Sequence, residues 1–121
     1  MMAKFSHIHI NVSDLSKSLE FYGEKLGLKT DKITDTMGSV SLEPGSLDLD
    51  QVPIEKLSEV STTKHTTLAF SVPSINDYYD EISLKGVQTL DKPTRRAWGS
   101  FNFYLKDPDG YMLEVEQQES S

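Results

Sequence analysis

The stretch FSHIHINVSDLSKSLEFYGEKLGL, residues 5–28, decides the fold of this chain. Its first part alternates between apolar and polar side chains, which predicts a β-strand over residues 5–12 with one apolar face. The apolar side chains then change to a helical spacing, with Ser13 as the expected N-cap. The members of this helical stripe are Leu15, Leu19, Tyr22 and Leu26. Gly27 supplies the left-handed conformation that commonly ends a helix.

The same order of elements returns 60 residues later, in TLAFSVPSINDYYDEISLKGV, residues 67–87. Sliding the chain by this offset places Ile10-Asn11-Val12 on Phe70-Ser71-Val72. An alternating strand is expected over residues 65–72, followed by a helix that Ser74 caps and Gly86 ends. A period of this kind indicates an internal duplication.

Each copy is expected to close with a hairpin. The first turns at Pro44-Gly45, and the second turns at Asp107-Pro108-Asp109-Gly110, where each residue type suits its position in a type I turn. Residues 29–34 and 87–90 are expected to add one further strand to each copy, and residues 53–63 a short helix and linker.

The patterns together predict one α+β domain of two βαβββ modules, residues 3–52 and 64–118. The two modules would form a curled mixed β-sheet around one cavity, with the helices on the outside.

Composition limits the class of function. The 121 residues carry a net charge of −7, and an acidic chain disfavours nucleic acid as a partner. Apolar runs are too short for a membrane span or for the apolar region of a signal peptide. The chain has no cysteine, which excludes disulfides and a cysteine nucleophile and fits a reducing compartment. We therefore expect a cytoplasmic protein with a small-molecule ligand and neither nucleic-acid nor membrane partners.

Three segments carry a resemblance to a known superfamily: residues 5–28, their repeat at 67–87, and FNFYLKDPDGYMLEVE at 101–116. They resemble the vicinal oxygen chelate superfamily, which includes glyoxalase I, the extradiol dioxygenases, fosfomycin-resistance thiol transferases and bleomycin-binding proteins. The resemblance covers nearly the whole chain and implies the paired-module fold and a homodimer. It does not define an activity, because the superfamily hosts several chemistries on one scaffold.

The resemblance also implies metal ligands from the first and last strands of each module. His7 and Asp48 match these positions in the first module and Glu114 in the second, as a site for one divalent cation such as Zn²⁺, Ni²⁺, Mn²⁺ or Fe²⁺. The fourth position holds Thr67, whose neutral hydroxyl is a poor ligand for such metals. His65 lies two residues away, about 6.5–7 Å along an extended strand, and would ligate only if the strand were bulged.

Further residues are candidates for binding a substrate. Trp98 could stack on a planar ligand or pack at the start of a strand. Arg96, in an otherwise acidic chain, could clamp an anionic group or lie in a solvated loop. The other candidates are His9, Asn11, Thr67 and Tyr104, with Asn102 and Glu116 depending on which face of residues 101–105 points inward.

Three functions fit these residues. The first is a metal-dependent lyase, isomerase or transferase whose cation chelates two neighbouring substrate oxygens, with Glu114 as the catalytic proton-shuttling base. The second is a metal-free protein, similar to the bleomycin-resistance type, that sequesters a cationic or aromatic drug. The third is a metal-free enzyme in which His7 and Glu114 act as acid and base. His9-Ile10-Asn11 lacks the basic residue with which glyoxalase I relatives hold glutathione.

Overall fold

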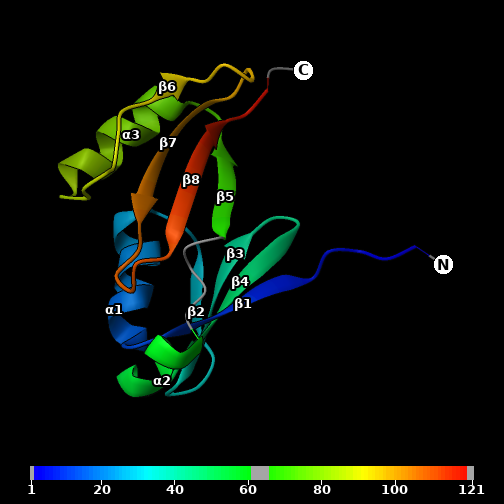
Figure 1. Cartoon of the computed structure of the whole chain (residues 1–121), viewed down its shortest axis with the longest axis vertical. Helices are drawn as coiled ribbons and strands as arrows, with labels where there is room; N and C mark the ends of the chain where they lie inside the picture. Colours follow the sequence, from blue (N-terminus) through cyan, green and yellow to red (C-terminus); the bar gives the residue numbers. More distant parts are fainter. Residues whose placement is uncertain (1, 61–65, 120–121) are drawn as a thin grey trace. The chain divides into compact units, whose positions relative to one another are not determined.

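The computed structural model describes residues 2–60 and 66–119 and divides into two compact units, Met1–Ser61 and Thr62–Ser121. Each unit contains one βαβββ module (Figure 1). The elements of the first unit are β1 (His7–Val12), α1 (Leu15–Leu19), η1 (Glu20–Lys25), β2 (Thr30–Lys32), β3 (Met37–Leu42), β4 (Gly45–Gln51) and α2 (Ile54–Val60). Those of the second are β5 (Thr67–Val72), α3 (Ile75–Leu84), β6 (Thr94–Arg95), β7 (Phe101–Lys106) and β8 (Met112–Gln117). The predicted α+β class and the two modules are confirmed.

Both sheets have the same strand order. The first runs β1-β4-β3-β2 and the second β5-β8-β7-β6. In each sheet the first and last strands of the module are parallel neighbours, which places His9 opposite Asp48 and Ala69 opposite Glu114. This shared register supports the duplication that the sequence predicts, and the cavity expected around the curled sheet stays a prediction.

The apolar face of the first sheet packs against α1. Gly38 on β3 allows this close approach, because a Cβ atom there would lie 3.1 Å from both Leu15 and Leu19. The buried apolar side chains of this unit are Ile10, Val12, Leu15, Tyr22, Leu26, Val40, Leu47 and Leu49. They include three of the four residues of the predicted helical stripe.

The first helix differs from the prediction at its start and in its second half. Ser13 as the N-cap was wrong: the carboxylate of Asp14 accepts the backbone N–H of Lys17 at 3.1 Å, so the cap lies one residue later. From Glu20 onward the helix is a π-helix, in which the N–H of Leu26 donates to the carbonyl of Phe21, five residues back. Gly27 ends it at φ +75°, as expected.

The second module differs from the prediction between its helix and its hairpin. Residues 87–90 form no strand, only an isolated bridge from Thr89 to Leu105, and the strand lies later, at β6. The reason is that a side-chain carboxylate, rather than a backbone carbonyl, accepts a backbone N–H of β7 here. Asp91 accepts the N–H of Tyr104 at 2.8 Å, while the N–H of Leu90 donates to the Tyr104 carbonyl at 2.8 Å.

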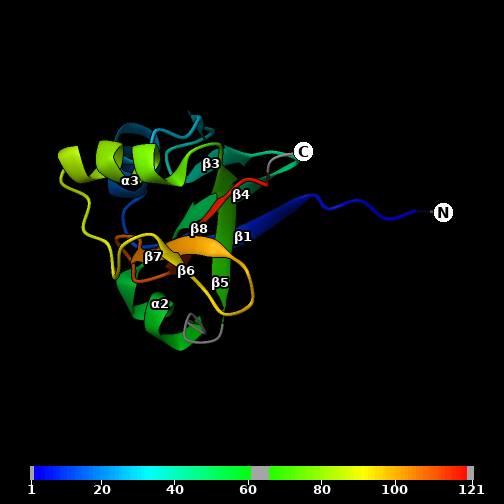
Figure 2. The ribbon, with the colours of Figure 1, turned by 90° about the horizontal axis from the view of Figure 1, so that it is seen from above.

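Helix α3 lies along one side of the second sheet (Figure 2) and packs on it through aromatic rings. Tyr79 meets Phe103 edge-to-face at 5.2 Å between centroids, and Tyr78 meets Phe70 at 6.1 Å. Burial, with a smaller contribution from Glu81, raises the pKa of the Tyr78 hydroxyl above its usual value. Ser74 caps α3 and Gly86 follows it at φ +83°, as the sequence predicts.

One glutamine in each module ties the end of the last strand to the start of the helix. Gln51 accepts the N–H of Leu15 at 2.7 Å, and Gln117 accepts the N–H of Ile75 at 2.8 Å. Each bond satisfies one of the backbone donors that a helix leaves unpaired in its first turn.

We therefore expect Gln51→Ala and Gln117→Ala each to lower the free energy of unfolding by about 1–2 kcal/mol, because each leaves such a donor without its partner. Urea denaturation measures this change. Gln118→Ala is the matched control, since its side chain is exposed, and it should change the stability by less than about 0.5 kcal/mol. An equal loss in all three variants would contradict the capping role.

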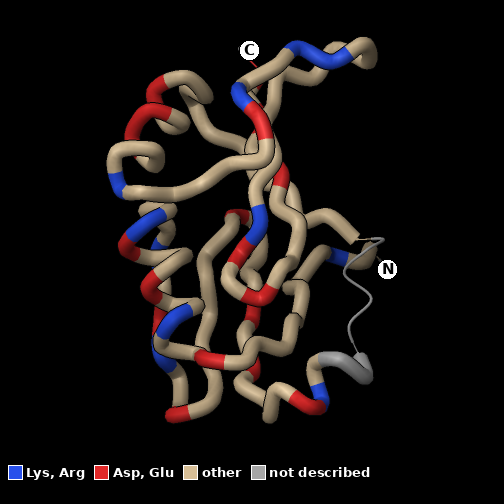
Figure 3. Tube along the Cα trace, turned by 60° about the vertical axis from the view of Figure 1, so that its left-hand side comes forward, with Lys and Arg blue, Asp and Glu red and all other residues tan. Residues whose placement is uncertain are grey.

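Along the described trace, both units carry Asp and Glu positions, and Lys and Arg positions are interspersed among these acidic positions (Figure 3). Within residues 2–60 and 66–119, no helix is long and apolar enough to cross a bilayer.

Candidate functional site

The polar face of the first sheet carries two imidazole–carboxylate pairs. His7 Nε2 lies 3.7 Å from Asp48 Oδ2, and His9 Nε2 lies 3.7 Å from Asp50 Oδ2. They come together because alternate residues of β1 and of its parallel neighbour β4 project to the same face. Asn11, directly opposite Asp50 in register, continues the row.

The two carboxylate oxygens of Asp48 have different partners. Oδ1 accepts the hydroxyl of Ser46 at 2.9 Å and the hydroxyl of Ser39 at 3.2 Å. Oδ2 faces His7, whose Nδ1 lies 2.8 Å from the Ser6 hydroxyl. The side chains of His7 and Asp48 are 46% and 35% exposed, so this pair is open to solvent and to a ligand.

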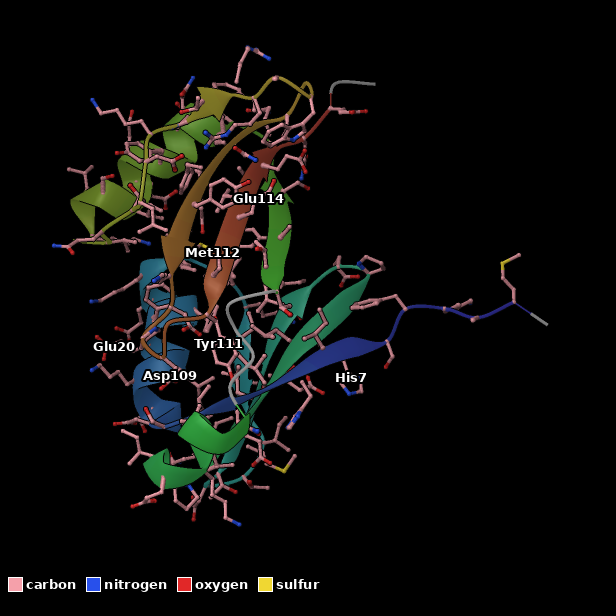
Figure 4. The ribbon with its side chains drawn as sticks, in the orientation of Figure 1. His7, Glu20, Asp109, Tyr111, Met112 and Glu114 are labelled. Atoms are coloured by element: carbon pink, nitrogen blue, oxygen red, sulfur yellow. The ribbon has the colours of Figure 1, made fainter. Side chains whose placement is uncertain are left out.

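In the second module, Glu114 occupies the corresponding place on β8, one alternation from Met112 (Figure 4). Glu114 Oε2 accepts the side-chain amide of Asn102 at 2.8 Å, and the Asn102 oxygen accepts Nε–H of Arg96 at 2.7 Å. Arg96 also forms an ion pair with Asp91. The predicted site residue is therefore one end of a connected polar network.

The remaining predicted residues are placed as follows. Tyr104 lies on β7 opposite Glu114, with the Arg96 guanidinium 5.3 Å from its ring centroid. Thr67 is exposed and pairs in register with Met112. Trp98 is 72% exposed, which leaves its ring available for stacking. His65 and the end of the expected linker, residues 61–63, lie outside the described residues.

Sequence reasoning missed several residues that hold the carboxylates. Ser39 and Ser46 bind Asp48, and Asp91 binds Arg96. The hydroxyls carry no local pattern that distinguishes them from other surface serines. Asp91 directly follows residues 87–90, which were predicted as a strand, and no signal indicated that its side chain would substitute for a ladder bond.

The metal implied by the resemblance can be tested against the donors present. Two ligands that are about 2.1 Å from one ion lie about 3–4 Å apart, so the 3.7 Å spacing of His7 and Asp48 fits one edge of a coordination shell. Among the described residues, however, no group of three or more His, Asp or Glu side chains is arranged to hold a metal.

A shallow groove of about 550 Å³ lies elsewhere in the first unit, beside η1 and β2. Its lining includes Leu19, Glu20, Glu24 and Thr30, and none of the predicted site residues.

The paired modules, with a carboxylate on the last strand of each, define a protein of the vicinal oxygen chelate class. The sequence matches the family described as the Glyoxalase/Bleomycin resistance protein/Dioxygenase superfamily over residues 4–115, and the chain belongs to this superfamily.

Three individual relatives each share less than a third of their aligned residues with this chain. The virulence protein STM3117 of Salmonella typhimurium is 28% identical over 94% of this chain and 83% of its own length. Its crystal structure superposes with a TM-score of 0.77, covering 98% of this chain and 99% of that one. The metallothiol transferase FosB of Staphylococcus saprophyticus is 26% identical (95% and 77% covered), and a probable lactoylglutathione lyase of Synechocystis is 29% identical (94% and 95% covered).

Proposed function

We propose that this protein binds small cationic or hydrogen-bond-donating molecules through the last-strand carboxylate of each unit, Asp48 in the first and Glu114 in the second. The observation that carries this proposal is that the two oxygens of each carboxylate have different environments. One oxygen is held by neighbouring side chains, namely Ser39 and Ser46 for Asp48 and Asn102 for Glu114. The other oxygen is oriented by these bonds and can accept from a ligand.

Charge and exposure support a cationic ligand. The chain carries a net charge of −7, which raises the local concentration of cations near carboxylate-bearing faces. The His7–Asp48 pair is solvent-exposed and 3.7 Å apart, so its attraction is screened and a ligand can replace it at little cost. The exposed ring of Trp98 adds a stacking surface for an aromatic ligand.

The test is a thermal-shift and calorimetric comparison of bleomycin, a simple diamine, and neutral and anionic molecules of similar size. Cationic probes should raise the melting temperature, because a ligand that binds only the folded state stabilises it. Stronger binding of the anionic molecules would contradict the proposal.

A second candidate is a metal-dependent lyase, isomerase or transferase acting on a substrate with vicinal oxygens. The spacing of His7 and Asp48 favours it, with Glu114 as the further ligand that the resemblance implies. Relatives named as a metallothiol transferase and a lactoylglutathione lyase agree with such chemistry.

If this second function is correct, protein purified without chelator or affinity metal will contain stoichiometric Zn, Ni, Mn or Fe by elemental analysis. His7→Ala should lose the metal, because it removes the one imidazole paired with Asp48. His9→Ala, whose imidazole pairs with Asp50 instead, is the matched control and should retain the metal. This candidate function would be contradicted if the purified protein contained no metal and added divalent ions did not raise its stability.

We also propose that the chain forms a homodimer and acts in the cytoplasm. The homodimer follows from superfamily membership, and the cytoplasmic location is supported by the absence of cysteine from the sequence.

A further inference from the structure

Asn102 is a fully buried polar side chain on β7, with 0% exposure. Its amide nitrogen donates to Glu114 Oε2, and its amide oxygen accepts from Arg96 Nε. An ionised carboxylate can only accept and a guanidinium can only donate. Only one orientation of the Asn102 amide satisfies both partners, so the network determines which end faces Glu114.

Arg96 is itself held from several sides. Its guanidinium pairs with Asp91 and lies 5.3 Å from the centroid of the Tyr104 ring. Its backbone N–H donates to the carbonyl of Ser100 at 2.7 Å. Asp91 is anchored in turn by the backbone N–H of Tyr104 at 2.8 Å. A continuous chain of four side chains therefore runs from Asp91 through Arg96 and Asn102 to Glu114.

We propose that Arg96 and Asn102 are positioning residues that hold Oε2 of Glu114 and leave Oε1 as its preferred acceptor, and that this arrangement selects the charged group of the ligand. The inference deepens the proposed function and rests on it. Asn102 takes one of the two lone pairs of Oε2, whereas Oε1 has no partner among residues 2–60 and 66–119, so Oε1 is the oxygen that Glu114 presents most openly to a ligand. Polarisation of the Asn102 amide by the Arg96 cation strengthens its hold on Oε2.

The consequence is a preference between two kinds of cation. A guanidinium binds a carboxylate best with two parallel hydrogen bonds, one to each oxygen, so at Glu114 one of the two would have to share Oε2 with Asn102. An ammonium is a compact charge that needs only one oxygen. The site should therefore select a primary ammonium over a guanidinium. In the first module, Ser39 and Ser46 occupy Oδ1 of Asp48, so different residues produce the same division.

Titration with n-butylammonium and n-butylguanidinium, followed by two-dimensional NMR, tests this preference. Wild-type protein should bind the ammonium about tenfold more tightly, the equivalent of one charge-assisted hydrogen bond. Asn102→Leu should abolish or reverse that ratio because it releases Oε2, and Arg96→Gln should reduce the ratio because Asn102 loses the cation that orients and polarises its amide. A merely structural role would weaken both probes alike and leave the ratio unchanged.

Arg95→Ala is the matched control, since the neighbouring Arg95 lies over the Phe101 ring, 4.6 Å from its centroid, and not in the network. It should keep the wild-type ratio. Unchanged ratios in Asn102→Leu and Arg96→Gln would overturn the inference, as would a wild-type preference for the guanidinium.

A second measurement separates this inference from the proposed function and needs no ligand. In wild-type protein, the Arg96 Nε–H and Asn102 amide resonances should be protected from exchange, and Glu114→Gln should shift both. If they respond in this way but neither probe binds, the network is correct and the proposed ligand class is wrong. If Glu114→Gln leaves both resonances unmoved, the positioning role itself is overturned.

Discussion

Replacing Phe103 by alanine is expected to lower the free energy of unfolding by about 3–5 kcal/mol. The Phe103 side chain is 0% exposed on the central strand β7, and its ring meets Tyr79 of α3 edge-to-face. Truncation removes this aromatic contact and leaves a cavity that rigid neighbours on β8 and α3 cannot fill by small movements. The loss is a large share of the stability of a small domain.

Urea denaturation followed by Trp98 fluorescence and by circular dichroism measures the change. Leu84→Ala, on the exposed side of α3, is the matched control, because its side chain is 90% exposed and its removal should change stability by less than about 0.5 kcal/mol. Similar losses in the two variants would contradict the assignment of Phe103 to the core.

Glu114→Gln is expected to weaken binding of a cationic ligand by about tenfold to a hundredfold. The substitution keeps the size of the side chain and removes its charge, so a charge-assisted hydrogen bond becomes a neutral one. It also leaves Asn102 facing an amide that can present a donor to it, which disturbs the orientation that Arg96 imposes. The affinity should therefore fall both because the charge of Glu114 is lost and because Asn102 loses its fixed orientation.

Calorimetric titration with the tightest cationic probe from the ligand comparison measures this effect. Glu116→Gln is the matched control on the same face of β8: Glu116 lies opposite Asn102 in register, but its carboxylate accepts the Ser100 hydroxyl at 3.0 Å, whereas the Asn102 amide donates to Glu114. Wild-type affinity should also fall as salt is added, since a screened charge contributes less. Equal affinities of the wild type and Glu114→Gln would contradict the role of this carboxylate.

Much of the fold was predictable because its signals are local. The alternation before each helix, the helical stripe, and Gly27 and Gly86 at the helix ends all act within a few residues of the chain. Repetition of these signals at a fixed offset made the duplication visible. The error at the start of the first helix also concerned neighbouring residues. Ser13 and Asp14 are both good caps, and only the geometry of the first turn chose Asp14.

The position of the last edge strand could not be read from its own residues. Residues 87–90 have the composition of a strand, but an edge strand exists only where its partner has unpaired backbone groups. The side chain of Asp91 takes the N–H of Tyr104, so regular pairing with β7 begins only at Thr94. A side chain that replaces a backbone acceptor has no periodicity from which to predict it.

The candidate site likewise contains some residues that the sequence could predict and others that it could not. His7, Asp48 and Glu114 could be proposed from the sequence, because the resemblance to the superfamily implies ligands on the first and last strands of each module. Their partners could not. Asn102 reaches Glu114 across neighbouring strands, and Arg96 reaches Asn102 from a loop.

From the opening stretch 5–28 and its repeat, the amino-acid order alone was enough to predict two βαβββ modules, and the superfamily resemblance added the last-strand carboxylates Asp48 and Glu114. Tertiary structure alone decided which oxygen of each carboxylate is held and which is presented. Backbone periodicity depends on neighbours along the chain, whereas a hydrogen bond between side chains depends on the register of strands that are distant in sequence.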